Sequence, residues 1–295
     1  MRFSLFVLLI FIKSITVYSQ TDQLKAQIEE IIKSKKATVG VAVMDLKNKE
    51  TLTINNEVHY AMQSVFKFHL ALAILNQVDK GKLSLNQKIY VSKGDIRPNT
   101  WSPLREKYPD GNVNLTLSEI LTYSVAQSDN NACDILFKVM GGSKKVNEYI
   151  HNLGVKDVSI VATEAQMHSD WNIQYTNWST PLAATSLLEK FYKKQILSKT
   201  SQDFLWKIMV ETTTGSTKIK ALLPKTATIA HKSGWSGSND AGLTAATNDI
   251  AIVTLPSGSQ FAIAIFVKNS TETEATNDLM IAEISKATYD YFAKK

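Results

Sequence analysis

The segment TVGVAVMDLKNKETLTI occupies residues 38–54, and it decides the fold class. Thr38 to Leu46 and Glu50 to Ile54 are rich in the β-branched residues that favour strands. Lys47-Asn48-Lys49 between them has the composition of a tight turn. We therefore predict two strands, joined by this turn, close to the beginning of the chain.

The flanking sequence divides into a helical and a second strand-rich part. Apolar residues recur at helical spacing in Gln23 to Lys35, and helical patterns return from about residue 63 to 211. Within the second region we expect helices at Ser64–Val78, after the capping box Thr116-Leu117-Ser118-Glu119, and at Asn131–Met140 before Gly141-Gly142. After Gly215 we expect short strands at Thr228–His231, Gly242–Ala246, Ile250–Leu255 and Phe261–Lys268, and a final helix at Asn277–Phe292.

This order of elements predicts an α/β fold of the α+β type. One antiparallel sheet would be built from strands of both chain ends and flanked by helices, with an all-helical domain inserted between them. We expect a sheet domain from residues 20–60 plus 215–295 and a mainly helical domain from residues 61–214. Residues 162–180 show no periodicity, and a loop of that length inside a compact protein is usually functional.

The N-terminus has the features of a secretory signal peptide, predicted at residues 1–19. Arg2 supplies the positive start, Phe3 to Ile12 form an apolar run, and Val17-Tyr18-Ser19 offers small residues for cleavage. The alternative is a hydrophobic first element of the fold. We expect cleavage near Ser19 and a periplasmic or secreted protein. No cysteine lies at the junction, so no lipid or other membrane anchor is expected.

Composition excludes several other classes. The 295 residues are 44% hydrophobic and 20% charged, which is typical of a globular enzyme-sized chain and not of a fibrous or disordered one. Cys133 is the single cysteine, so the sequence holds no internal disulfide and no cysteine-based zinc site; we expect it to be a small core residue. Five scattered histidines form no helical zinc motif. A net charge of +6 without a basic stripe predicts no nucleic-acid partner.

The chemistry is carried first by Ser64-Val65-Phe66-Lys67. Positions three apart share a helix face, so the serine hydroxyl and the lysine amine can meet. A serine becomes a nucleophile only when a base takes its proton, and a lysine with a lowered pKa can do so. The alternative is a surface serine and lysine without a role. The apolar neighbours Phe66, Phe68 and Leu70 argue against it, because a buried lysine requires a partner.

Two further motifs follow in order, Ser128-Asp129-Asn130 between two predicted helices and Lys232-Ser233-Gly234 at the end of a predicted strand. Taken alone, each is well explained as a turn or helix cap. The three together form the motif set of penicillin-recognising serine enzymes. The sequence thereby resembles the class A serine β-lactamases over essentially all of the chain after the signal peptide.

The resemblance implies a role for each motif residue. Ser64 resembles the acylated nucleophile and Lys67 its proton partner, while Ser128 would relay a proton to the β-lactam nitrogen. The substrate-binding residues would be Asn130 for the side-chain amide, Lys232 and Ser233 for the carboxylate, and Gly234 beside them. The backbone N–H groups of Ser64 and Trp235 would form the oxyanion hole. No metal or other cofactor is implied.

The resemblance also places the deacylating base at Glu164 in the long loop, where it would activate water against the acyl-enzyme. Here the sequence departs from the commonest pattern: His168 stands where an asparagine usually supports the water, and Ala162 and Asn177 replace an Arg–Asp ion pair at the loop base. With these departures the sequence resembles the extended-spectrum cephalosporinase branch of the family, which includes PER- and CfxA-type enzymes. Trp235 is a further departure, since small residues are usual there; its side chain either lines the pocket or packs outside the strand.

We therefore expect a monomeric hydrolase of β-lactam antibiotics, with cephalosporins of the oxyimino type among its substrates. One rival is a penicillin-binding D,D-peptidase, which shares the three motifs but generally lacks a base such as Glu164. The other is a β-lactam or cell-wall-binding sensor module without turnover. The joint presence of Ser64, Lys67, Ser128 and Lys232 argues against a module that only binds.

Overall fold

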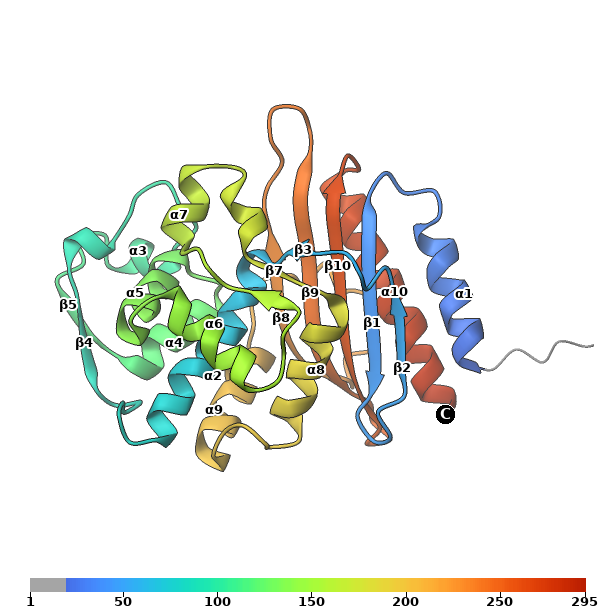
Figure 1. Cartoon of the computed structure of the whole chain (residues 1–295), viewed down its shortest axis with the longest axis horizontal. Helices are drawn as coiled ribbons and strands as arrows, with labels where there is room; N and C mark the ends of the chain where they lie inside the picture. The colour runs from blue at the N-terminus through green and yellow to red at the C-terminus, as the bar shows by residue number, and fades with distance from the viewer. Residues whose placement is uncertain (1–19) are drawn as a thin grey trace, which may run out of the picture.

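The structure, a computed structural model, describes residues 20–295. The predicted signal peptide, residues 1–19, lies outside the described residues. A five-stranded antiparallel sheet runs through the molecule in the order β2-β1-β10-β9-β8 (Figure 1). Its strands are β1 (Thr38–Asp45), β2 (Thr51–Ile54), β8 (Thr228–Trp235), β9 (Thr244–Thr254) and β10 (Gln260–Ser270). The predicted sheet of strands from both chain ends is confirmed, and β1 pairs with β10 over its whole length.

Helices cover the two faces of this sheet (Figure 1). On one face lie α1 (Gln20–Ile32) and α10 (Glu274–Lys294), whose apolar side chains pack with one set of alternate strand residues, such as Ile263 and Ile265. The other set, including Ala264 and Phe266, belongs to the larger core under the helical region. The alternation follows from the two-residue period of a strand, which sends successive side chains to opposite faces.

The helical region lies between β2 and β8 in the chain. Its helices are η1 (Gln63–Val65), α2 (Phe66–Asp79), η2 (Lys93–Asp95), α3 (Pro103–Lys107), α4 (Leu117–Ala126), α5 (Asn130–Met140), α6 (Ser143–Asn152), α7 (Glu164–Ser169), η3 (Ile173–Thr176), α8 (Pro181–Tyr192) and α9 (Lys199–Val210). Small antiparallel pairs join β4 (Lys88–Val91) to β5 (Val113–Thr116), and β7 (Trp178–Ser179) to β3 (Tyr60–Ala61) and β6 (Val158–Ser159).

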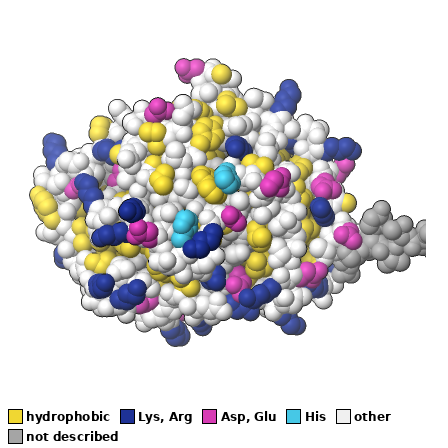
Figure 2. All heavy atoms as spheres, viewed as in Figure 1, with side chains coloured by type: hydrophobic (Ala, Val, Ile, Leu, Met, Phe, Trp, Pro, Cys, Tyr) yellow, Lys and Arg dark blue, Asp and Glu magenta, His cyan; other side chains and the backbone are white. Residues whose placement is uncertain are grey.

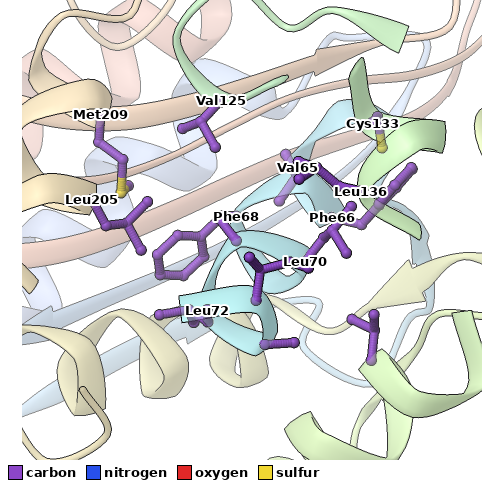
Figure 3. Close-up of a cluster of buried hydrophobic side chains, with 14 of the residues drawn as sticks. Val65, Phe66, Phe68, Leu70, Leu72, Val125, Cys133, Leu136, Leu205 and Met209 are labelled. Carbon is purple, nitrogen blue, oxygen red and sulfur yellow. The ribbon is translucent and has the colours of Figure 1, made fainter. Parts of the chain in front are cut away.

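Helix α2 is the centre of the helical region. Every residue from 66 to 75 is buried, so the helix is enclosed on all sides, as expected for a helix that is apolar all round. Figure 3 shows the side chains of Phe66, Phe68 and Leu72 among those of Val125, Leu136, Leu205 and Met209. Cys133 is fully buried in this cluster, and burial raises the pKa of its thiol well above the ordinary value. The rigid packing around α2 holds the residues at its N-terminal end in place.

Two local predictions about helix ends are borne out by geometry. Thr116 and Glu119 form the expected capping box at the start of α4. Gly141 ends α5 in the left-handed conformation that glycine adopts without strain.

The C-terminal strands differ from the prediction in two respects. The two strands expected at Gly242–Ala246 and Ile250–Leu255 are a single strand, β9, because Asn248 and Asp249 do not form a turn. Both side chains are fully buried in the ladder and hydrogen-bonded, Asn248 to main-chain carbonyls near residue 62 and Asp249 to His231. Strand β8 also continues to Trp235, so Lys232-Ser233-Gly234 lies within a strand and not in a turn after it.

The segment 162–180, expected to be an aperiodic loop, contains three short elements, α7, η3 and β7. None of the helices formed by residues 20–295 combines the length and hydropathy of a transmembrane span. On the face shown in Figure 2, basic and acidic side chains are interspersed without forming a continuous basic surface.

Candidate active site

Ser64 lies in the short 3₁₀ turn η1, directly before the buried helix α2. Lys67, one turn later, is completely buried, and its Nζ donates to Ser64 Oγ at 2.7 Å. The predicted Ser–Lys contact across one helical turn is therefore present. Because α2 is held on all sides, both side chains are fixed relative to the rest of the site.

Lys67 is surrounded by polar atoms from four residues. Besides Ser64, its ammonium donates to the main-chain oxygen of Ser128 at 2.9 Å and to Asn130 Oδ1 at 2.6 Å. An ammonium has three protons, and these bonds use all of them. Glu164 Oε1 lies 2.8 Å from the same nitrogen as an ion-pair partner, and it accepts no hydrogen bond from the described part of the chain. Lys67 thus contacts both Ser64 and Glu164.

Glu164 is placed by an aspartate that sequence analysis did not single out. It is the first residue of α7, and Asp134 of α5 accepts hydrogen bonds from the N–H groups of Glu164 at 2.8 Å and Ala165 at 3.0 Å. Arg97 pairs with the same carboxylate at 2.9 Å. The first N–H groups of a helix lack partners within it, so Asp134 satisfies them and fixes the start of α7. The sequence gives only a weak signal for the contact between Asp134 and Glu164, because the two residues are thirty positions apart.

Ser128 contacts both Lys67 and Lys232. Lys232 Nζ donates to Ser128 Oγ at 2.9 Å, and Ser128 has a left-handed backbone with a φ of 57°. Burial, and after it the nearby charge of Lys67, lower the pKa of Lys232 to about 7. Ser128 therefore lies between two lysines, with its main chain on Lys67 and its hydroxyl on Lys232.

The motif residues open into one cavity of about 350 Å³. Its lining includes Ser64, Ser128, Asn130, Ser233 and Gly234 together with Trp101, Trp235, Glu274, Asp278 and residues 214–218. The side chain of Trp235 is 49% exposed and that of Trp101 is 56% exposed, so two tryptophans border the opening. Trp235 is thus among the residues that line the cavity. The cavity also holds a buried ion pair that sequence analysis missed, Lys218 Nζ to Asp278 Oδ1 at 2.7 Å.

The residues before Ser64 are held against β8 and β9. A Cβ on Gly234 would lie 2.6 Å from the carbonyl oxygen of Met62 and 3.1 Å from the nitrogen of Ser64, so only glycine fits there. Asn248 donates to the carbonyls of Ala61 at 2.8 Å and Met62 at 3.1 Å. This packing brings the main chain at Ser64 next to the strand that ends at Trp235.

The base of the 162–180 segment is closed by a neutral side chain. Asn177 Oδ1 accepts from the N–H groups of Val161 at 2.8 Å and Ala162 at 2.9 Å, and its Nδ2 donates to the Ala162 carbonyl at 2.8 Å. Asn177 therefore closes the loop base by hydrogen bonds with the main chain, where the sequence lacks an ion pair. His168, expected beside the water site, is exposed on α7, and the structure gives it no contact with Ser64 or Lys67.

No group of three or more His, Cys, Asp or Glu side chains within residues 20–295 is arranged to hold a metal ion. The contacts described above bring together Ser64, Lys67, Ser128, Glu164 and Lys232, that is, two hydroxyls, two lysines and a carboxylate.

Comparisons with known proteins agree with this geometry. Residues 23–292 match the model of the β-lactamase enzyme family. The chain is 47% identical to β-lactamase VEB-1 of Pseudomonas aeruginosa over 100% of this chain and 98% of that one. It is 46% identical to the extended-spectrum β-lactamase PER-1 of Pseudomonas aeruginosa, covering 98% and 94% of the two chains.

Solved structures are similar over the same range. A TLA-1 extended-spectrum β-lactamase superposes with a TM-score of 0.91 at 55% identity, covering 92% of this chain and 99% of that one. A class A β-lactamase from Bacteroides cellulosilyticus gives a TM-score of 0.91 at 42% identity, with coverage of 94% and 100%. With a Ser–Lys pair whose lysine also contacts the main chain of the second serine and the loop carboxylate, this chain belongs to the β-lactamase enzyme family, as a class A serine enzyme.

Proposed function

We propose that this enzyme hydrolyses β-lactam antibiotics, cephalosporins of the oxyimino type included, through an acyl-enzyme on Ser64 that Glu164 resolves. The observation that carries the proposal is the position of Lys67 Nζ, 2.7 Å from Ser64 Oγ and 2.8 Å from Glu164 Oε1. One buried cation thus contacts both the hydroxyl that would attack the substrate and the carboxylate that would activate water.

In acylation, Ser64 Oγ attacks the lactam carbonyl while its proton leaves. Two routes are open in this geometry: transfer to Lys67 in its neutral form, or transfer through a water to Glu164. Ser128 then gives its hydroxyl proton to the departing lactam nitrogen and recovers one from Lys232, whose ammonium donates to Ser128 Oγ at 2.9 Å. The negative charge on the carbonyl oxygen would be held by the N–H groups of Ser64 and Trp235, and losing one such donor typically costs about 2.7–4 kcal/mol of barrier.

In deacylation, Glu164 takes a proton from water, which attacks the Ser64 ester. Asp134 and Arg97 hold the start of α7, so the carboxylate is presented from a fixed helix end. This step hydrolyses the Ser64 ester, which a D,D-peptidase or a sensor would retain.

Substrate binding follows from the other polar groups of the cavity. Lys232 and Ser233 would bind the carboxylate, because the one carries the charge and the other a hydroxyl at the cavity wall. Asn130 donates one amide proton to Thr100 at 2.7 Å, which leaves the second for the carbonyl of the substrate's side-chain amide. The tryptophans at the opening offer apolar surface to bulky substituents. Relatives described as extended-spectrum support the inclusion of oxyimino cephalosporins.

We also propose that the site lies between a sheet domain (20–60 plus 215–295) and a helical domain (61–214), since the cavity takes residues from both ranges. Ser64, Lys67, Ser128 and Glu164 of one chain contact one another directly, which supports a monomer as the active form. The basic start and apolar run of residues 1–19 support export to the periplasm or the medium.

The test combines a chromogenic cephalosporin with intact mass on the purified chain. Wild-type protein should turn over, and Ser64→Ala should show neither turnover nor adduct. Glu164→Ala should acylate and accumulate the adduct, because removing a general base commonly slows its step by ~10²–10⁴-fold. A persistent adduct on the wild type would identify a peptidase or sensor. If Glu164→Ala deacylated at the wild-type rate, the base would lie elsewhere, and His168 would be examined next.

A further inference from the structure

A buried pair of glutamines joins the loop that carries Glu164 to the turn that carries Ser64. Gln63 Nε2 donates to Gln174 Oε1 at 2.5 Å, although the two residues are 111 positions apart. Gln63 is 8% exposed and Gln174 is 5% exposed, so little water competes for this bond. Gln174 belongs to η3, in the same 162–180 segment as α7.

The backbone conformation of Gln63 is one that the bond to Gln174 can stabilise. Gln63 directly precedes Ser64 and has a φ of 48°, in the left-handed region that non-glycine residues rarely occupy. Such a conformation persists only where surrounding contacts hold it. The side-chain bond to Gln174 is one contact that can hold it, because Gln174 is itself fixed by donating to the Trp171 carbonyl at 2.6 Å.

The same turn is held by the loop a second time and by the sheet. Met62 N–H donates to the carbonyl of Asn177 at 2.8 Å, and Asn248 holds the carbonyls of Ala61 and Met62 from β9. Gly234 packs against the turn from β8. The direction of the Ser64 N–H is therefore set from two sides, the sheet and the 162–180 segment.

We propose that Gln63 and Gln174 are positioning residues for the reaction, acting as one unit that aims the Ser64 N–H at the developing oxyanion. The inference rests on the proposed function, in which Ser64 is acylated. The oxyanion forms in acylation and again in deacylation, so loss of the pair should slow both steps. This distinguishes the pair from Glu164, whose removal should slow mainly deacylation.

The variants are chosen to separate the side-chain bond from the backbone conformation. Gln63→Asn keeps a residue that tolerates positive φ but shortens the amide so that it cannot reach Gln174. Gln174→Ala removes the partner and leaves residue 63 unchanged. Gln202→Ala is the matched control, because Gln202 is a buried glutamine of equal exposure, 5%, on α9 outside the cavity.

Single-turnover acylation and deacylation rates are measured with a cephalosporin, together with inhibition by phenylboronic acid, which forms a tetrahedral adduct with a nucleophilic serine. We expect each glutamine variant to slow both steps by about 10-fold, within the roughly 10²-fold that a misplacement of 1 Å can produce. The affinity for phenylboronic acid should fall by a similar factor. The double variant should be no slower than the slower single variant, because the effects of coupled residues are non-additive.

The outcomes divide cleanly. If the wild type forms no acyl-enzyme, the proposed function fails and the pair has no reaction to serve. If the wild type turns over but the glutamine variants match Gln202→Ala, or if their effects simply multiply in the double variant, the positioning role is wrong while the hydrolase remains. Slower deacylation with unchanged acylation and boronate affinity would also overturn it, since the pair would then act only through the loop.

Discussion

Replacing Asn177 with alanine should open the base of the loop that carries Glu164. The amide of Asn177 is fully buried, and it satisfies both main-chain groups of Ala162, a residue that is itself only 4% exposed. Alanine would leave that N–H and that carbonyl without partners. The bond to Val161 matters less, because Val161 is 51% exposed and water can replace the amide there.

The magnitude follows from these two groups. A buried polar group left unsatisfied costs about 1–3 kcal/mol, so two of them give a range of about 2–6 kcal/mol. Water entering the space of the lost amide would satisfy part of the demand, which favours the lower half of the range. We therefore expect a loss of about 3 kcal/mol of unfolding free energy, equivalent to a fall in Tm of roughly 5 °C for a chain of this size.

Urea unfolding of both proteins, extrapolated linearly to water, measures the difference. Asn147→Ala provides the comparison, because Asn147 makes a single bond of the same kind nearby, accepting from the Ile160 N–H at 2.9 Å. It should lose only about 1 kcal/mol. Equal losses for the two variants would refute the idea that Asn177 closes the loop base.

Three other predictions concern activity. Lys232, with its pKa lowered to about 7, loses charge as pH rises through that value, so kcat/KM for an anionic β-lactam should decline above about pH 7. Because this pKa lies below the unfolded value of about 10.4, the unfolded chain binds more protons between these pH values, and stability from this group should rise there while activity falls. Lys232→Arg should flatten the alkaline limb; an unchanged limb would assign it to another group. Gly234→Ala should lower kcat/KM at least ~10²-fold, since its Cβ would meet the Met62 carbonyl at 2.6 Å, whereas Gly94→Ala, with its nearest contact at 3.7 Å, should retain wild-type activity. An oxyimino cephalosporin, a simple cephalosporin and a penicillin should differ in a graded way, as pocket contacts worth about 1–3 kcal/mol allow, and a penicillin value more than a hundredfold above both others would contradict the cephalosporinase assignment.

Local chemistry explains which parts of the site were predictable. Ser64 and Lys67 are one helical turn apart, so sequence spacing alone placed them together. The capping box at Thr116 was readable for the same reason. Asp134 was not, because nothing local distinguishes a helical aspartate that caps α7 from one facing solvent. Lys218 likewise looks like a surface lysine until the fold brings Asp278 beside it.

The strand boundary that was misplaced within β9 is explained by buried hydrogen bonds. Asn248 and Asp249 are turn-forming residues in the middle of β9, and by composition they divided one strand into two. Both residues fit within the strand because each hydrogen-bonds a buried polar group. Asn248 donates to the carbonyls of Ala61 and Met62, and Asp249 pairs with His231. Local rules are expected to fail where a residue serves a site and not its own element. Strand β9 departs from the strand pattern at the place where it supports the turn before Ser64, so the misplaced boundary itself marks a residue that holds the turn carrying the proposed nucleophile.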